Sequence, residues 1–322
     1  MNPERHTTDF FVIGVVKGGT TSLYDYLNQH PELYLPPIKE INHFARTDID
    51  ESKFLPEYAT DVSIDLERYF KNGMPEMVHI AHINDPNDYK KLYSPAQAGQ
   101  KTGDISNSYM ICPSAASAIH AHNPSAKIIV ILRNPINRAW SQYLMNLRES
   151  KTETKDFIEE LENDSRAVNQ GWGVNHQYLE LGNYSKQLKL YYDLFSAEQI
   201  LPIIFEEYVK QPTIALRKIC QFIGVSPEFE FDTSGKKNAA SLPRNKTLNS
   251  LLVKSGAIKL AKDLVPRKLR QNLSGVLYSS KNLPSLATEE ISYLRGYYLS
   301  EINGLCSLIN RDLTSIWQEF KS

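Results

Sequence analysis

The sequence predicts an α/β fold in which helices flank a central parallel β-sheet. Three apolar runs, at residues 9–14, 127–132 and 199–205, are each followed by a segment with helical spacing. Uninterrupted apolar runs of this length are typical of strands that are buried on both faces. Because such strands alternate with helices along the chain, they are expected to lie parallel in one sheet.

The first two strand–helix units have clear local signals. Residues 9–14 run into a glycine turn, and a helix is predicted over residues 20–30. The β-branched run 127–132 (KIIVIL) leads into a helix over residues 135–149. That helix carries proline in its first turn, where the missing N–H group leaves no hydrogen bond unmade.

The later elements follow in the same order. Residues 199–205 predict a third strand, although Pro202 within the run argues slightly against it. Residues 214–223 predict the helix after it. Residues 288–300 and 303–320 also have helical spacing, so the chain is expected to end in helices.

Two stretches interrupt this alternation in what we interpret as a single domain of 322 residues. Residues 45–100 are polar and punctuated by Pro and Asn, which predicts an irregular insertion with short helices. Residues 233–281 contain eleven Lys or Arg and one acid, Asp263, giving a local net charge of +10 (eleven minus one). This basic region has three possible interpretations. It could be a lid that attracts an anionic acceptor, or a helix over 251–277 that lies on a membrane surface. The third interpretation, a solvated helical face, is the one we favour.

Composition argues against several classes of function. Lys plus Arg total 36 and Asp plus Glu total 37, so no general basic character indicates nucleic-acid binding. Cys112, Cys220 and Cys306 are far apart and form no Cys/His cluster, which argues against a disulfide framework or a metal site. No apolar run is long enough to cross a bilayer and no signal-peptide pattern begins the chain, so a cytoplasmic location is expected.

The turn after the first strand is a candidate anion site. Its residues are Lys17, Gly18, Gly19, Thr20, Thr21 and Ser22. A glycine turn that opens a helix directs successive backbone N–H groups at one place, which suits phosphate or sulfate. A lone glycine pair would indicate only a strand–turn–helix joint, but a contiguous Lys, Gly and hydroxyl run favours anion binding.

This turn differs from the loop that binds Mg·ATP. The pattern GxxxxGK[ST] would require lysine at position 20, where this chain has Thr20, and the lysine has moved to Lys17. No predicted strand ends convincingly in an acid that would hold Mg²⁺. An ATP-dependent P-loop phosphotransferase is therefore disfavoured.

A second basic group follows the second strand. Arg133 comes directly after residues 127–132, and Ser141 lies about two turns into the next helix. Open α/β sheets bind ligands beyond the carboxyl ends of their strands. The planar guanidinium fork and a serine hydroxyl together suit a second phosphate, whereas Arg133 alone would equally suit an ion pair with a surface acid.

Together the two segments resemble the cofactor signatures of the PAPS-dependent sulfotransferases, where PAPS is 3′-phosphoadenosine 5′-phosphosulfate. Residues 17–23 (KGGTTSL) resemble the family's 5′-phosphosulfate loop, and residues 133–141 (RNPINRAWS) resemble its 3′-phosphate segment. Residues 37–44 (PIKEINHF) and 178–188 (YLELGNYSKQL) are similar to the bacterial and carbohydrate-modifying branch. The resemblance covers nearly the whole chain and implies a P-loop-like fold.

The resemblance implies transfer of a sulfuryl group from PAPS to a hydroxyl or amine, with release of the bisphosphate PAP. Lys17 would neutralise the departing phosphate oxygen, and residues 18–22 would hold the 5′-phosphate. Arg133 and Ser141 would bind the 3′-phosphate. Glu40 would act as the general base that takes the acceptor's proton.

Other roles follow from the same resemblance. Lys39 would hold the sulfonate or orient Glu40, although the two also read as an exposed charge pair in a Pro-rich loop. His43 reads as a second acid/base group or as a buried histidine beside Phe44. Three residues expected after a short strand would face the acceptor, namely Asp104, Ser106 and Tyr109. Tyr184 would lie near the adenosine or in the core.

The resemblance favours a carbohydrate or glycolipid acceptor, such as an anionic glycan or a lipid-linked sugar. Golgi members of the family carry a membrane anchor that this sequence does not show. Asn42 and Ile105 replace a His and a Lys found in some heparan-modifying members, so no particular polysaccharide is indicated. A catalytically silent PAP-binding module is a further alternative, and the presence of Lys17 and Glu40 argues against it.

Overall fold

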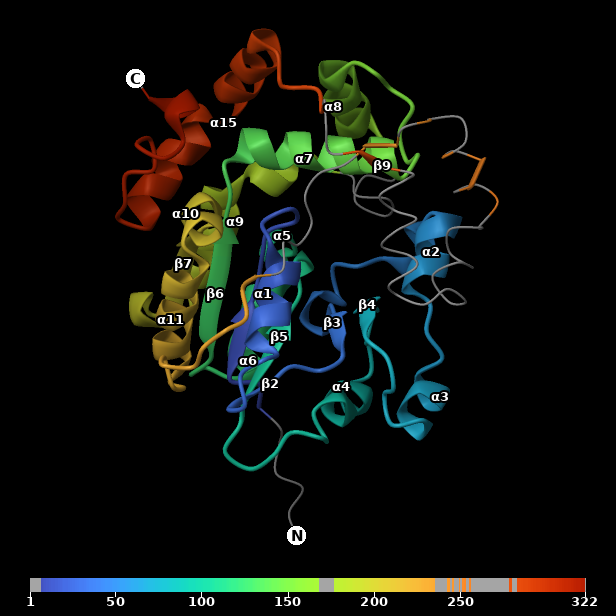
Figure 1. The fold of residues 1–322 in the computed structure, drawn as a ribbon, viewed down its shortest axis with the longest axis vertical. Helices are drawn as coiled ribbons and strands as arrows, with labels where there is room; N and C mark the ends of the chain where they lie inside the picture. The colour runs from blue at the N-terminus through green and yellow to red at the C-terminus, as the bar shows by residue number, and fades with distance from the viewer. Residues whose placement is uncertain are drawn as a thin grey trace.

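The computed structural model describes residues 7–167, 177–234 and 283–321 (Figure 1). It also describes the isolated residues 242, 243, 245, 249, 251, 252, 255, 278 and 279. Within these ranges the central sheet has five strands in the order β2-β5-β1-β6-β7, all paired in parallel. Its strands are β1 Phe10–Val12, β2 Leu33–Tyr34, β5 Lys101–Ile105, β6 Lys127–Leu132 and β7 Ile200–Ile204. The predicted α/β fold with a parallel sheet is confirmed.

The apolar strands form because both faces of the sheet are covered. Successive side chains alternate between two core clusters: Phe11 and Ile128 face one, whereas Phe10 and Ile129 face the other. Helices α6 (Pro113–His122), α9 (Tyr184–Tyr192) and α15 (Thr288–Leu308) cover the first face, and α1 (Thr20–Leu27) and α11 (Pro212–Ile223) cover the second. Each large apolar side chain buried in this way contributes about 1.5–3 kcal/mol.

The sequence signals account for the elements around β6 and β7. Helix α7 (Pro135–Arg148) begins at its proline, and the Asn134 side chain caps it by accepting from the backbone N–H of Ile136 at 3.0 Å. Pro202 lies within β7, which is an edge strand, so its missing N–H group removes no hydrogen bond of the sheet.

The C-terminal region differs from the prediction. Helix α15 is continuous from Thr288 to Leu308, and residues 309–320 form turns and a 3₁₀ helix at Gln318–Phe320. The helix continues past residue 300 because Ile302 and Leu305 are fully buried on α9. It ends before Asn310, whose φ of 50° is incompatible with a right-handed helix.

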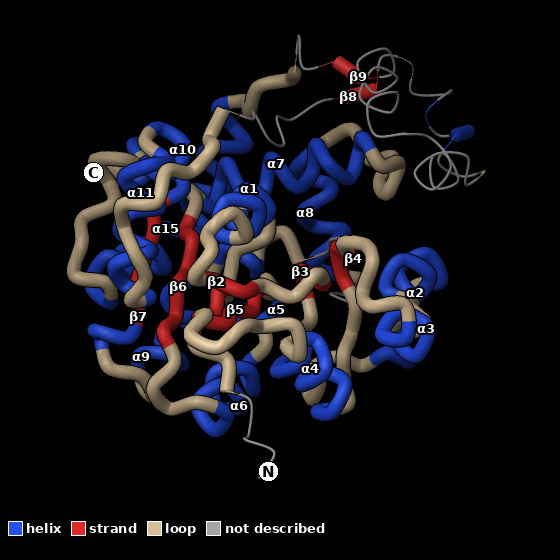
Figure 2. Tube along the Cα trace, turned by 60° about the horizontal axis from the view of Figure 1, so that its bottom comes forward, coloured by secondary structure: helices blue, strands red, loops and turns tan. Residues whose placement is uncertain are grey.

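The insertion at residues 45–100 contains the expected short helices and one strand that was not predicted. The helices are α2 Pro56–Val62, α3 Leu66–Lys71 and α4 Pro86–Leu92, with a 3₁₀ turn at Glu51–Lys53. Strand β4 (Val78–Ile80) pairs in parallel with β3 (Ile38–Glu40), and Figure 2 shows them side by side next to α2 and α3. The insertion thus builds a small second sheet beside Glu40.

The remaining elements complete the described chain. They are α5 Ser108–Ile111, α8 Phe157–Arg166, α10 Phe205–Lys210, β8 Leu242–Pro243, β9 Tyr278–Ser279, and 3₁₀ turns at His43–Ala45, Glu180–Gly182 and Ala197–Gln199. Most of the basic region 233–281, including nearly all of 251–277, lies outside the described residues. No helix that the structure describes is long and apolar enough to cross a membrane.

Candidate active site

The predicted site residues gather at the carboxyl edge of the sheet, where its parallel strands end together. The Ser106 amide donates to the Val12 carbonyl at 3.1 Å, and the Met110 amide donates to the Ile13 carbonyl at 2.9 Å. These bonds hold the end of β5 against the end of β1. On the other side of β1, β6 ends at Leu132, so Arg133 enters the same edge.

The turn between β1 and α1 requires glycine at two positions. Gly19 has φ +90°, and a Cβ atom there would lie 3.0 Å from the Phe205 ring. At Gly18 a Cβ atom would lie 2.8 Å from the Val15 carbonyl oxygen. Neither position has room for a side chain. The Gly18 amide donates to the Val15 carbonyl at 2.8 Å and closes the turn, so the amides available to an anion are those that begin α1.

The hydroxyl residues of this turn have different surroundings. The Ser22 hydroxyl donates to the Gly19 carbonyl at 2.8 Å and shares a hydrogen bond of 3.0 Å with the Tyr208 hydroxyl. Thr20 is buried at the first position of α1, whereas Thr21 is partly exposed. The amides of this first helical turn have no partners within the helix, which is the property an anion site needs.

Arg133 is tied directly to this turn. Its Nη1 donates to the Lys17 carbonyl at 2.8 Å, and its guanidinium lies 4.7 Å from the centre of the Phe205 ring. Its Nε is buried and has no hydrogen-bond partner among the described residues. Burial lowers the pKa of Arg133, an effect that Glu206 partly opposes. The side chain therefore joins the two predicted anion sites.

Lys17 lies between Arg133 and helix α7. Its Nζ contacts the Met145 sulfur at 3.4 Å. Burial, together with the charges of Arg148 and Arg133, lowers the pKa of Lys17 to about 8, and Glu149 partly opposes this shift. An ammonium whose charge is already disfavoured in this way gains more than an exposed lysine from an anionic partner.

The face of α7 that reaches Lys17 also carries Ser141. Ser141, Met145 and Arg148 follow a spacing of four and three residues, which places them along one side of a helix. Arg148 also pairs with Glu149 at 2.8 Å, and Lys151 pairs with Glu149 at 3.0 Å. Arg148 was not among the predicted site residues, although its helical spacing from Ser141 was a usable signal.

Glu40 ends strand β3 and is held by two donors. Lys39 Nζ and Asn107 Nδ2 reach the same carboxylate oxygen, Oε1, at 2.5 and 2.8 Å. The Lys39 side chain is only 1% exposed and that of Glu40 is 12% exposed. The pair is therefore not an exposed charge pair in a loop. The contribution of Asn107 had no sequence signal, because it depends on β5 ending beside β3.

A buried polar network holds the backbone that follows Glu40. The Ser106 hydroxyl accepts from the amides of Ile41 and Asn42 at 3.0 and 3.2 Å and donates to Asp104 at 2.7 Å. Tyr109 donates to the other oxygen of Asp104 at 2.7 Å, and burial raises the pKa of Asp104 to about 7.

This network corrects one prediction, because Asp104 lies within β5 and not after a strand. Asp104, Ser106 and Tyr109 have no exposed surface. Their side chains bond to one another, to the backbone amides of Ile41, Asn42 and Phe44, and to the Tyr89 hydroxyl.

His43 and Tyr184 are both buried. The His43 Nδ1 bonds to the Ile83 carbonyl at 2.6 Å, its ring packs beside Phe44, and burial lowers its pKa to about 4. His43 is therefore a neutral buried histidine at physiological pH. Tyr184 belongs to the core and donates to the Arg133 carbonyl at 2.9 Å, so it supports Arg133 from behind.

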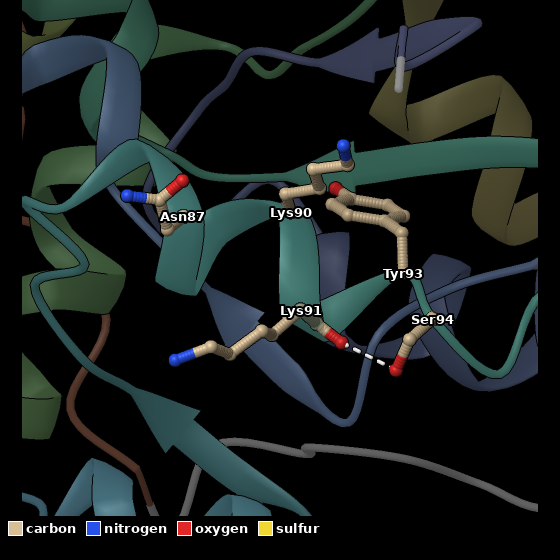
Figure 3. A pocket seen from close by; sticks show the side chains of 5 residues that line it. All are labelled: Asn87, Lys90, Lys91, Tyr93 and Ser94. Atoms are coloured by element: carbon tan, nitrogen blue, oxygen red, sulfur yellow. Dashed lines mark hydrogen bonds between the residues drawn. The ribbon is translucent and has the colours of Figure 1, made fainter. Parts of the chain in front are cut away.

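A separate hollow of about 430 Å³ lies on and just after α4 (Figure 3). It is lined by Asn87, Lys90, Lys91, Tyr93 and Ser94. The Ser94 hydroxyl donates to the Lys91 carbonyl at 2.8 Å. None of these residues belongs to the predicted site. In the part of the chain that the structure describes, no group of three or more His, Cys, Asp or Glu side chains is placed to hold a metal ion.

The fold and this edge define an α/β protein in which two segments with predicted anion sites are linked by Arg133. The family model described as the sulfotransferase family matches residues 9–230, which is well over half of the chain. The chain therefore belongs to the sulfotransferase family, as the sequence motifs predicted.

Individual relatives agree with this assignment. Mouse carbohydrate sulfotransferase 15 is 26% identical over 246 residues, covering 68% of this chain and 44% of that protein. Mouse heparan sulfate glucosamine 3-O-sulfotransferase 3B1 is 25% identical over 217 residues, covering 66% and 45%. The chain thus spans less than half the length of these relatives.

A solved structure matches nearly the whole chain. The sulfotransferase from Alicyclobacillus acidocaldarius is 25% identical, with a TM-score of 0.66 and coverage of 97% of this chain and 99% of that one. Its likeness supports the predicted P-loop-like fold.

Proposed function

We propose that this chain transfers a sulfuryl group from PAPS to a hydroxyl or amine of an acceptor and releases PAP. The hydrogen bond from Arg133 to the Lys17 carbonyl carries the proposal, because it holds two basic segments from separate strands at one edge. PAPS has anionic groups on both sides of one nucleoside. A protein that binds it needs two such sites at a fixed separation.

The residues present fit this molecule. The glycine turn suits the 5′-phosphosulfate because it leads directly into the first turn of α1, whose amides have no partners within the helix. Arg133 keeps a buried Nε without a partner in the described residues, which suits a further anionic ligand. With Ser141 on α7, Arg133 would hold the 3′-phosphate.

The catalytic roles follow from charge. Lys17, as an ammonium, would neutralise the phosphate oxygen that keeps the electron pair when the sulfur–oxygen bond breaks. Glu40 would accept the proton of the acceptor as the new sulfur–oxygen bond forms. Lys39 and Asn107 hold the carboxylate of Glu40 by hydrogen bonds. The Ser106 hydroxyl holds the adjoining backbone by accepting from the Ile41 amide.

We further propose a carbohydrate or glycolipid acceptor, since the two mouse relatives are named for carbohydrate and heparan sulfate sulfation. We also propose a cytoplasmic location and peripheral membrane contact through residues 251–277, a stretch that lies almost wholly outside the described residues. Two alternatives are an ATP-dependent phosphotransferase and a silent PAP-binding module.

Calorimetry tests the nucleotide site without a known acceptor. PAP, AMP, ADP and ATP are titrated in the absence of magnesium, with Arg133→Ala as the variant. We expect selective binding of PAP that is lost in Arg133→Ala. Equal or better binding of ATP, especially with magnesium, would favour a phosphotransferase. PAP binding without turnover of any acceptor would favour the silent module.

A further inference from the structure

Three aromatic side chains form a cluster that the mechanism above does not use. Phe54 and Tyr58 come from the start of the insertion and helix α2, and His82 follows strand β4. The Tyr58 hydroxyl and His82 Nε2 are 3.0 Å apart. The ring centres of Phe54 lie 4.9 Å from Tyr58 and 5.2 Å from His82. All three residues are partly buried.

The pairing of β3 with β4 places this cluster beside Glu40. Glu40 is in register with Ile80, and the Ala81 amide donates to the Glu40 carbonyl at 2.9 Å. His82 is the next residue. The charge of the Glu40 carboxylate acts on both His82 and Tyr58. It partly opposes the lowering of the His82 pKa by burial, and it adds to the rise in the pKa of Tyr58. The cluster therefore adjoins the candidate base.

We propose that Phe54, Tyr58 and His82 form the acceptor subsite and that it takes an uncharged, hydroxyl-bearing sugar ring. This inference rests on the proposed function and names its substrate class. Aromatic faces pack against the apolar face of a ring, while the phenol and the imidazole exchange hydrogen bonds with hydroxyl groups. Such a mixture of aromatic surface and a few polar atoms is typical of small-molecule sites.

The charges around the cluster favour a neutral sugar over an anionic glycan. Burial lowers the pKa of His82 to about 4, so its imidazole is neutral at physiological pH. The carboxylates that act on the cluster are Glu40, which is paired with Lys39, and the exposed Glu51 and Asp61. A carboxylate or sulfate on the acceptor would be repelled there, which is a common way to reject a competing ligand.

Two matched probes test this inference. p-Nitrophenyl β-glucoside and p-nitrophenyl β-glucuronide differ only at C6, where the glucuronide has a carboxylate in place of the hydroxymethyl group. With labelled PAPS, we expect kcat/KM for the glucoside to exceed that for the glucuronide by about tenfold or more. Preference for the glucuronide, or transfer to neither probe, would overturn the proposal.

Variants then locate the subsite. Tyr58→Phe and His82→Gln are expected to raise KM for the glucoside about tenfold while leaving KM for PAPS and the affinity for PAP unchanged. Glu51→Gln removes one of the nearby carboxylates, so the ratio of kcat/KM for the glucoside to kcat/KM for the glucuronide should fall. Tyr293→Phe, on the exposed side of α15, is the matched control and should leave every constant unchanged. An unchanged KM in Tyr58→Phe and His82→Gln would overturn the assignment.

The same experiments separate this inference from the proposed function. If the wild-type protein binds PAP selectively but discriminates in favour of the glucuronide, only the acceptor assignment fails. If PAP does not bind selectively, the sulfotransferase proposal itself fails. Melting temperatures of the variants guard against misfolding, and Tyr58→Phe keeps the ring that packs on Phe54.

Discussion

The guanidinium of Arg133 donates a hydrogen bond to the main-chain carbonyl of Lys17, 116 residues away along the chain. Lys17 has a positive φ of 67°, a conformation that non-glycine residues rarely adopt. The bond and the stacking of the guanidinium on Phe205 at 4.7 Å hold the turn in this form. Arg133 thus shapes the first candidate anion site, and its remaining donors are the ones we propose for the 3′-phosphate.

Arg133→Lys should therefore be a severe substitution despite keeping the charge. Lysine lacks the planar fork and the stacking surface, so we expect the affinity for PAP to fall about 10- to 100-fold. Calorimetry measures the change. Arg166→Lys on the exposed surface of α8 is the control and should bind PAP like the parent protein. Wild-type affinity in Arg133→Lys would contradict the dual role.

The lowered pKa of Lys17 predicts a basic limb in the pH profile. Because the active form carries the proton, kcat/KM for PAPS should fall as pH rises through about 8. Arg148→Gln removes a cation that lowers this pKa, so the fall should move to higher pH. A profile that stays flat up to about pH 10 would contradict the role of the Lys17 ammonium.

The buried ion pair of Lys39 and Glu40 allows stability to be separated from catalysis. Glu40→Gln removes the base and leaves a buried ammonium without its carboxylate partner. We expect lost turnover, nearly unchanged PAP affinity and a loss of about 3–5 kcal/mol in unfolding free energy. The double variant Lys39→Met/Glu40→Gln should recover most of that stability without recovering turnover. Denaturant unfolding and sulfate transfer measure the two effects, and turnover in either variant would exclude Glu40 as the base.

Two glycines with the same backbone conformation test the turn. Gly19 and Gly99 have φ of +90° and +91°, but only Gly19 has neighbours within reach of an added Cβ. Alanine at either position should cost about 1–2 kcal/mol of backbone strain. Gly19→Ala should also weaken PAP binding about tenfold or more, because the Phe205 ring must move. Equal PAP affinity in the two variants would mean that the turn does not bind the ligand.

Much of the fold follows from local patterns. The run at residues 127–132 became β6 with the predicted bounds, and α7 began at Pro135. Strand β4 escaped prediction because three residues, Val78–Ile80, are too few to show a period and form a strand only by pairing with β3. The continuous α15 escaped it because the burial of Ile302 and Leu305 is decided by α9 and not by their own spacing.

The sequence by itself determined the parallel sheet and the two segments that carry anion-binding chemistry. Strand burial, glycine turns and the residue after a strand are local properties, readable from neighbouring residues. Tertiary structure decided what surrounds those segments. It brought Asn107 to Glu40 across 67 residues, buried Lys39, and placed Tyr58 and His82 beside the candidate base. These contacts depend on which strands end at one edge of a sheet, and no spacing along a single segment contains that information.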